Sequence, residues 1–142
     1  YIGYILSLIS STLNHIELEN CSLEDSSIKY IVKGLNDCFD LKILNLGKNF
    51  LTESSIIFLN ELTTKNLLDL NLFGNNIGNK GLELFHFNKI EKISRINLSN
   101  NQITSIESIS LFLDKIVLDD INLSRNSFEE KEDEIEKFVE IL

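Results

Sequence analysis

The spacing of apolar residues between Leu67 and Ile77 sets the pattern of the whole chain. In this stretch, LLDLNLFGNNI, the residues Leu67, Leu70, Leu72 and Ile77 are apolar, and Asn75 stands between the last two. The same spacing starts near residues 13, 41, 67, 93 and 118, so the units repeat every 25 to 28 residues. Apolar residues two positions apart point to the same side of an extended strand. The pattern therefore predicts five short strands, each with one buried face.

Helical spacing of apolar residues follows the strands. The positions that carry it are Ile28, Ile31, Val32 and Leu35; then Ile56, Leu59 and Leu62; then Leu82 and Phe85; and finally Ile135, Phe138, Val139 and Leu142. The opening residues 1–12 have the same helical spacing but no preceding strand. They are predicted to be the helix of an incomplete upstream unit.

The unit LxxLxLxxN/CxL, followed by a helix, resembles the leucine-rich repeat, in its ribonuclease-inhibitor-like type, over residues 13–142. The resemblance implies an α/β solenoid of one domain, 1–142, with parallel strands on the concave side and helices on the convex side. No single unit can bury its leucine face alone, so units stack and share one core. Because methionine is absent from the chain, we expect it to be a fragment of a longer protein.

One polar position recurs just before the last apolar residue of each unit. It is occupied by Cys21, Asn49, Asn75, Asn101 and Asn126. An amide at this place can satisfy backbone groups where the strand turns away from its neighbours, so we interpret the column as structural. For Cys21 the alternative is a reactive or metal-bound thiol, but no cysteine or histidine ligands lie nearby in sequence, and we expect no metal.

The strand positions between the leucines are expected to line the concave face and to bind a partner. They are His15, Glu17, Glu19, Ile43, Asn45, Lys48, Asp69, Asn71, Phe73, Arg95, Asn97, Asp120, Asn122 and Arg125. Asparagine is disfavoured in strands, yet it fills the middle of this face in four consecutive units. These amides either hydrogen-bond to one another or present a polar strip to a partner.

Two groups within this face have opposite interpretations. Asp69, Arg95 and Asp120 alternate in sign on adjacent strands, which favours mutual neutralisation over a binding site. Ile43 and Phe73 are apolar at positions expected to face solvent, so they are candidate anchors for a partner. The charged residues of the face sum to only −1, which argues against strong electrostatic capture.

The formal net charge of −9 is uneven, because residues 129–142 carry −5 of it. We predict an acidic C-terminal helix there, which covers the end of the array or docks a basic partner. Nucleic acid is excluded because phosphate binding needs clustered Lys and Arg. Two cysteines make no disulfide framework, which favours a cytoplasmic protein. No apolar stretch has the length of a membrane span.

Enzyme classes are excluded by the residues present. The only histidines, His15 and His86, lie in different units, and the GNNIGNKG stretch lacks the Ser or Thr of a phosphate-binding loop. No cofactor is expected. The sequence favours a protein–protein interaction module. Alternatives are a small-GTPase regulator resembling Ran GTPase-activating proteins, and the substrate-recognition part of a ubiquitin ligase or of a sensor or effector. Exposed edge strands also predict end-to-end self-association.

Overall fold

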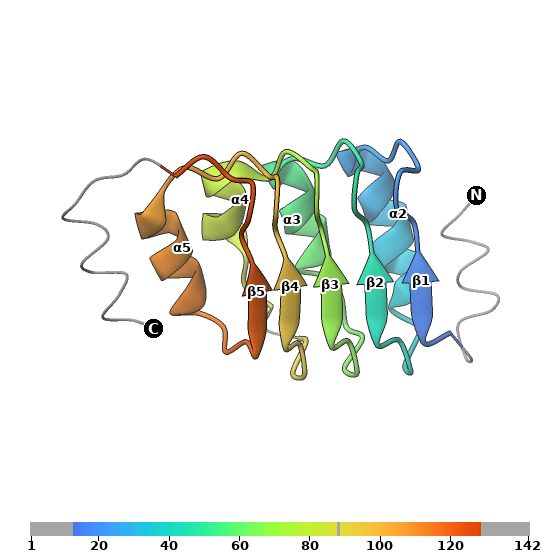
Figure 1. The fold of residues 1–142 in the computed structure, drawn as a ribbon. Coiled ribbons are helices and arrows are strands. Elements are labelled where there is room, and N and C mark those ends of the chain that lie inside the picture. Colours follow the sequence, from blue (N-terminus) through green and yellow to red (C-terminus); the bar gives the residue numbers. More distant parts are fainter. Residues whose placement is uncertain (1–12, 88, 129–142) are drawn as a thin grey trace.

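A computed structural model describes residues 13–87 and 89–128 of the chain. Strands and helices alternate along this part (Figure 1). Its five strands are β1 (His15–Glu17), β2 (Ile43–Asn45), β3 (Asp69–Asn71), β4 (Arg95–Asn97) and β5 (Asp120–Asn122). Its four helices are α2 (Asp25–Leu35), α3 (Glu53–Leu59), α4 (Gly78–Leu84) and α5 (Ile106–Leu113). The helices predicted at residues 1–12 and 129–142 lie outside the described residues.

The described strands form one parallel sheet whose spatial order follows the sequence, β1-β2-β3-β4-β5. Equivalent positions of the units stand side by side, so Ile16 pairs with Leu44, Leu44 with Leu70, Leu70 with Ile96, and Ile96 with Ile121. The helices lie together behind the sheet (Figure 1). The predicted α/β class with parallel strands is confirmed. The face of the sheet turned away from the helices is called the open face below.

The core lies between the sheet and the helices. The middle residue of the strand and the second residue after it are fully buried in the central units, as with Leu70 and Leu72. The apolar face predicted for α2 is buried as expected. Phe85 and Phe112 extend the core toward the C-terminal units, with ring centroids 5.4 Å apart. Burying a side chain of this size contributes about 1.5–3 kcal/mol.

Two helices are shorter than their apolar patterns. Leu62 and Phe85 are buried, but they lie after the ends of α3 and α4. The side chain of Asn60, the C-cap of α3, donates to the carbonyl oxygen of Leu84 and accepts from the backbone nitrogen of His86. This contact joins the chain after α3 to the next unit. Helix α5, for which no apolar face was predicted, buries Ile109 and Phe112.

A left-handed residue follows each strand at the same place in its unit. The residues are Asn20, Lys48, Gly74, Asn100 and Arg125, with φ between 52° and 67°. Glycine takes this conformation freely, whereas other L-residues take it at a cost of roughly 1–2 kcal/mol. Backbone hydrogen bonds hold the turn, as when the nitrogen of Lys48 donates to the carbonyl oxygen of Phe73 at 2.6 Å. The turn geometry therefore repeats even where the residue type does not favour it.

Candidate functional site

Four amides pair the backbone where the strands leave the sheet. They belong to Asn49, Asn75, Asn101 and Asn126, and each bonds to its own unit and to the preceding one. Asn49, for example, accepts from the backbone nitrogens of Cys21 and Leu23 at 3.0 Å. It donates to the carbonyl oxygens of Leu18 and Leu46 at 2.9 Å. These contacts tie neighbouring units together.

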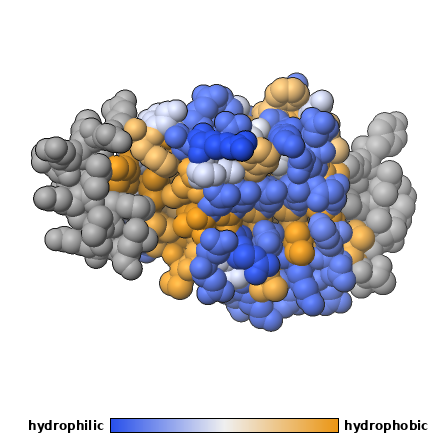
Figure 2. Space-filling model, in the orientation of Figure 1, coloured by the Kyte–Doolittle hydropathy of each residue, from blue (hydrophilic) through white to orange (hydrophobic). Residues whose placement is uncertain are grey.

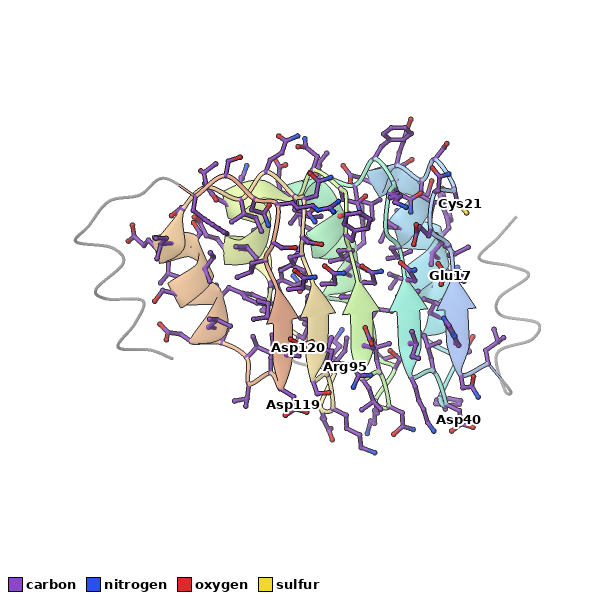
Figure 3. The ribbon with its side chains drawn as sticks, viewed as in Figure 1. Glu17, Cys21, Asp40, Arg95, Asp119 and Asp120 are labelled. Carbon is purple, nitrogen blue, oxygen red and sulfur yellow. The ribbon has the colours of Figure 1, made fainter. Side chains whose placement is uncertain are left out.

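Cys21 lies in the same column but makes different contacts. Its side chain is exposed (labelled in Figure 3), and its thiol donates to the carbonyl oxygen of Glu19 at 3.5 Å. A thiol has one weak donor, so it cannot replace an amide that donates twice and accepts twice. Among the described residues, no group of three or more His, Cys, Asp or Glu side chains has the geometry for a metal ion.

Asparagine amides run along the open face in a row formed by Asn45, Asn71, Asn97 and Asn122. Figure 2 shows this side of the molecule as largely hydrophilic over the sheet, with hydrophobic residues gathered toward α5. The side-chain oxygen of each amide accepts from the backbone nitrogen two residues ahead, at 2.9 to 3.0 Å. The amide oxygens therefore bond within their own units, and among the described residues no hydrogen bond joins two of these four amides. The interpretation that they bond mainly to one another is wrong.

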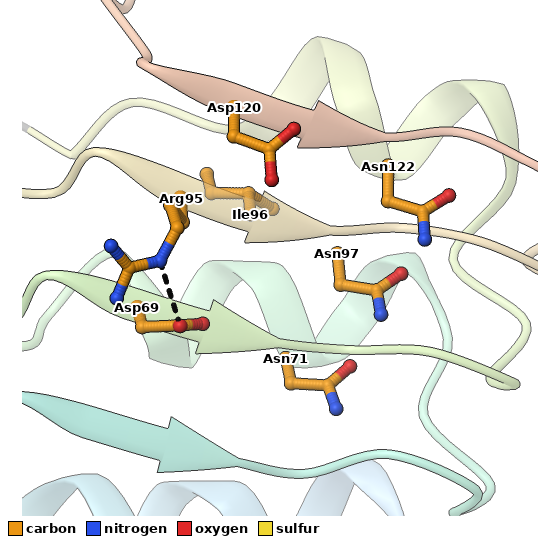
Figure 4. A pocket seen from close by; sticks show the side chains of 7 residues that line it. All are labelled: Asp69, Asn71, Arg95, Ile96, Asn97, Asp120 and Asn122. Carbon is orange, nitrogen blue, oxygen red and sulfur yellow. Dashed lines mark hydrogen bonds and ion pairs between the residues drawn. The ribbon is translucent and has the colours of Figure 1, made fainter.

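These bonds fix the direction of each amide. The oxygen must face the backbone N–H, so the NH₂ group points away from the strand. In Asn71, Asn97 and Asn122 this group donates to none of the residues that the structure describes, and the three amides lie nearly parallel (Figure 4). These NH₂ groups are in contact with solvent, and Asn122 is exposed, so an acceptor on a partner takes the place of water, for a net gain of about 0.5–1.5 kcal/mol per hydrogen bond. The row therefore offers three unused donors.

Around Lys48, just beyond the ends of β1 and β2, the open face is closed by its own side chains. The NH₂ group of Asn45 donates to Glu19 at 3.3 Å, and Lys48 forms an ion pair with Glu19 at 2.8 Å. The ammonium group of Lys48 also lies 5.4 Å from the ring centroid of Phe73. The hydrogen bond from Lys48 lowers the pKa of the Glu19 carboxyl, with a further contribution from Asn45. The polar groups of Glu19, Asn45 and Lys48 therefore pair with one another, which leaves few of them to bind a partner.

Of the two predicted apolar anchors, Phe73 lies against this closed part. Ile43 and Phe73 are both half-buried, and the ring of Phe73 is covered on one side by Lys48. Neither belongs to the large apolar side chains that stand clear of the surface among the described residues. Two of these, Phe39 and Phe50, are on loops, and Tyr30 is on α2.

The three alternating charges are only partly paired. Arg95 lies between Asp69 and Asp120 on the neighbouring strands, in the same register as both. Its Nε donates to Asp69 at 3.0 Å, while Asp120 has no ion pair or side-chain hydrogen bond to the described residues (Figures 3 and 4). The expected neutralisation of all three charges is therefore wrong for Asp120. The carboxylate of Asp120 therefore has no charged partner among the described residues.

A hollow of about 270 Å³ lies beside that carboxylate. Its lining consists of Asp69, Asn71, Arg95, Ile96, Asn97, Asp120 and Asn122. Six of these residues were predicted on the concave face. The seventh, Ile96, is the buried middle residue of β4 and forms the floor. Unused donors, a free carboxylate and open space thus coincide over β3, β4 and β5.

The remaining predicted residues lie outside this hollow. His15 and Glu17 are exposed on β1, with Nε2 and Oε2 separated by 3.6 Å. Arg125 is exposed beyond β5. The second histidine, His86, lies in the contact with Asn60 described above, far from His15 in the sequence.

A second set of contacts between units was missed by the sequence reasoning. Asp25 accepts from the backbone nitrogen and the hydroxyl of Thr52, at 2.8 and 2.7 Å. Asn79 accepts from the backbone nitrogens of Thr104 and Ser105 and donates to the Thr104 hydroxyl. The signal was the recurrence of short polar residues 25 to 27 positions apart, at or next to the starts of the helices.

No helix in the described part of the chain is both long enough and apolar enough to cross a membrane. No family model matches the chain. The chain is similar to Protein PAC2 from Saccharomyces cerevisiae, with 34% identity over 123 residues. The similarity covers 84% of the chain, but the chain spans only 21% of the length of that yeast protein.

Proposed function

We propose that the chain is part of a leucine-rich-repeat solenoid of the ribonuclease-inhibitor-like type, and that it binds another protein on its concave face. The solenoid is supported by five strands at equivalent places in five sequence units, paired in consecutive order. Stacked units of this kind share one core and present an extended surface.

The observation that carries the binding proposal is the row of unused amide donors over the hollow. Asn71, Asn97 and Asn122 direct NH₂ groups outward, next to the free carboxylate of Asp120. Fixed polar groups of both kinds suit a polypeptide, which has a carbonyl acceptor and an amide donor at almost every residue. The binding surface then covers β3, β4 and β5, while the closed part near Lys48 contributes at its rim.

Selection of peptides from a random display library on the immobilised full chain tests the proposal. Affinities of the selected peptides are then measured for the chain and for two variants. Asn122→Arg places a long charged side chain in the hollow, while Asn76→Arg makes the same change at an exposed asparagine outside it. Circular dichroism verifies that both variants are folded.

We expect Asn122→Arg to weaken the selected peptides at least about tenfold, a cost of about 1.4 kcal/mol, and Asn76→Arg to leave them unchanged. Equal binding to both variants would overturn the concave-face proposal, as would a selection that yields no peptide. The other functions considered, small-GTPase regulation and substrate recognition in a ubiquitin ligase, are favoured by no specific contact in the described residues.

A further inference from the structure

We propose that the hollow selects a polypeptide segment carrying an arginine or lysine side chain. The cationic group pairs with Asp120, and carbonyl oxygens of the same segment accept from the amides of Asn97 and Asn122. This inference rests on the proposed function, because it names the chemistry of the partner at the same surface.

The charge balance of the hollow calls for one cation. Asp69 and Arg95 are paired through Nε at 3.0 Å and neutralise each other. Asp120 has no such partner among the described residues, so the lining carries one uncompensated negative charge. An acidic side chain entering here meets like charge, which opposes binding. A basic side chain completes the alternation of charges along the three strands.

The amides call for carbonyl acceptors beside that cation. Asn122 lies two residues after Asp120 on β5 and on the same face of the strand, about 6.8 Å further along it. Asn97 lies on β4, directly opposite Asn122, at the usual strand separation of about 4.8 Å. A short extended segment spans these distances. A free cation without a main chain fills only the Asp120 end of the hollow.

Arg95 does not supply the missing cation. It is in register with both aspartates, but its guanidinium group turns toward Asp69 and away from Asp120 (Figure 4). The geometry implies an unusual outcome for the removal of this residue. Without Arg95 the hollow holds two free carboxylates, so a basic segment binds more tightly than it does to the original chain.

Nuclear magnetic resonance with two defined peptides provides the test. The probes are acetyl-Gly-Gly-Arg-Gly-Gly-amide and the same peptide with citrulline, a neutral analogue of almost the same shape. Each is titrated into the ¹⁵N-labelled full chain, and the side-chain NH₂ signals of Asn97 and Asn122 are followed. We expect saturable shifts with the arginine peptide and binding about three- to fivefold weaker with citrulline, as for an exposed ion pair.

Three variants separate the ion pair from general damage. Asp120→Asn is expected to remove the preference for arginine over citrulline, and Arg95→Gln to tighten the arginine peptide about two- to threefold. The matched control Asp119→Asn removes the same charge one residue away, outside the hollow, and retains the preference. A preference that survives Asp120→Asn, or weaker binding to Arg95→Gln, would overturn the inference.

The two proposals fail in different ways. If library-selected peptides depend on Asn122 but show no preference for basic residues, and the arginine probe causes no shifts, the function stands and the basic partner is wrong. If binding does not involve Asn122 at all, both fail.

Discussion

The side-chain nitrogen of Asn75 donates a hydrogen bond to the carbonyl oxygen of Leu46, which lies 3.0 Å away in the preceding unit. The same amide donates to Leu72 at 2.8 Å and accepts from the backbone nitrogen of Leu51 at 3.1 Å. Asn75 is 7% exposed, so water does not easily replace these partners. One side chain thus joins the ends of two strands.

Replacing Asn75 with alanine is expected to lower the free energy of unfolding by about 1–3 kcal/mol, because buried backbone groups lose their partners. Urea unfolding followed by circular dichroism measures the change. The control is Asn76→Ala, since Asn76 is the next residue and its side chain is exposed. Equal losses in the two variants would show that the buried amide has no special role.

Truncating Leu70 in the core is expected to lower the free energy of unfolding more than replacing Asn75 does. The Leu70 side chain is completely buried in the middle of β3. Leu70→Ala is expected to cost about 2–5 kcal/mol through lost burial and the cavity that remains. Leu111→Ala on α5 serves as the matched control because Leu111 is 44% exposed. A similar shift of the urea midpoint in both proteins contradicts the assignment of Leu70 to the core.

The left-handed turn predicts which residues position 74 accepts. Gly74 has φ of 67°, and its equivalents Asn20 and Asn100 have φ of 56° and 55°. Gly74→Ala is expected to destabilise the fold by roughly 1–2 kcal/mol, since alanine is strained there. Gly74→Asn is expected to cost less, because asparagine tolerates this conformation. Thermal unfolding compares the two, and a less stable Asn variant would argue against backbone strain as the cause.

The contact between Lys48 and Glu19 predicts a pH effect of definite sign. The hydrogen bond from Lys48 lowers the pKa of the Glu19 carboxyl in the folded state. The contact between the two side chains therefore stabilises the fold at pH values above the pKa that Glu19 has in the unfolded chain. The contribution is lost as pH falls through the lowered pKa. Titration by nuclear magnetic resonance should show this pKa rising in Lys48→Ala. An unchanged pKa in this variant would remove Lys48 as the main cause.

The periodic apolar positions were sufficient to predict the strands and the class of the fold. Residues such as Leu44 and Leu70 recur at fixed spacing because equivalent positions pair side by side in the parallel sheet. The helix boundaries were less predictable. Leu62 is apolar at helical spacing and is buried, yet it lies beyond the end of α3. Burial fixes residue type there, whereas the helix end depends on polar contacts such as those of Asn60.

The sequence identified the residues of the predicted concave face, but not which of them are free to bind a partner. The repeat spacing places Asn97 and Asp120 on one surface, but it does not show which of its polar groups are already hydrogen-bonded within the chain. That distinction depends on distances between strands. The carboxylate of Glu19 accepts from Asn45 and forms an ion pair with Lys48. Asp120, in contrast, lies beside Arg95, whose side chain pairs with Asp69 instead. The pattern alone therefore identified the surface, but not the hollow over β3, β4 and β5, where some of its polar groups have no partner among the described residues.

The consecutive order of the strands also determines how the protein responds to pulling. Within the described part, strands are hydrogen-bonded only between units that follow one another directly, so β2, β3 and β4 have two neighbours each and β1 and β5 have one. Force applied between the two ends of the sheet is carried by these rows of bonds in series, so that they rupture one at a time instead of shearing together. The chain would therefore extend in steps of roughly one unit, peeling from an end, as expected where stability is a sum over neighbours.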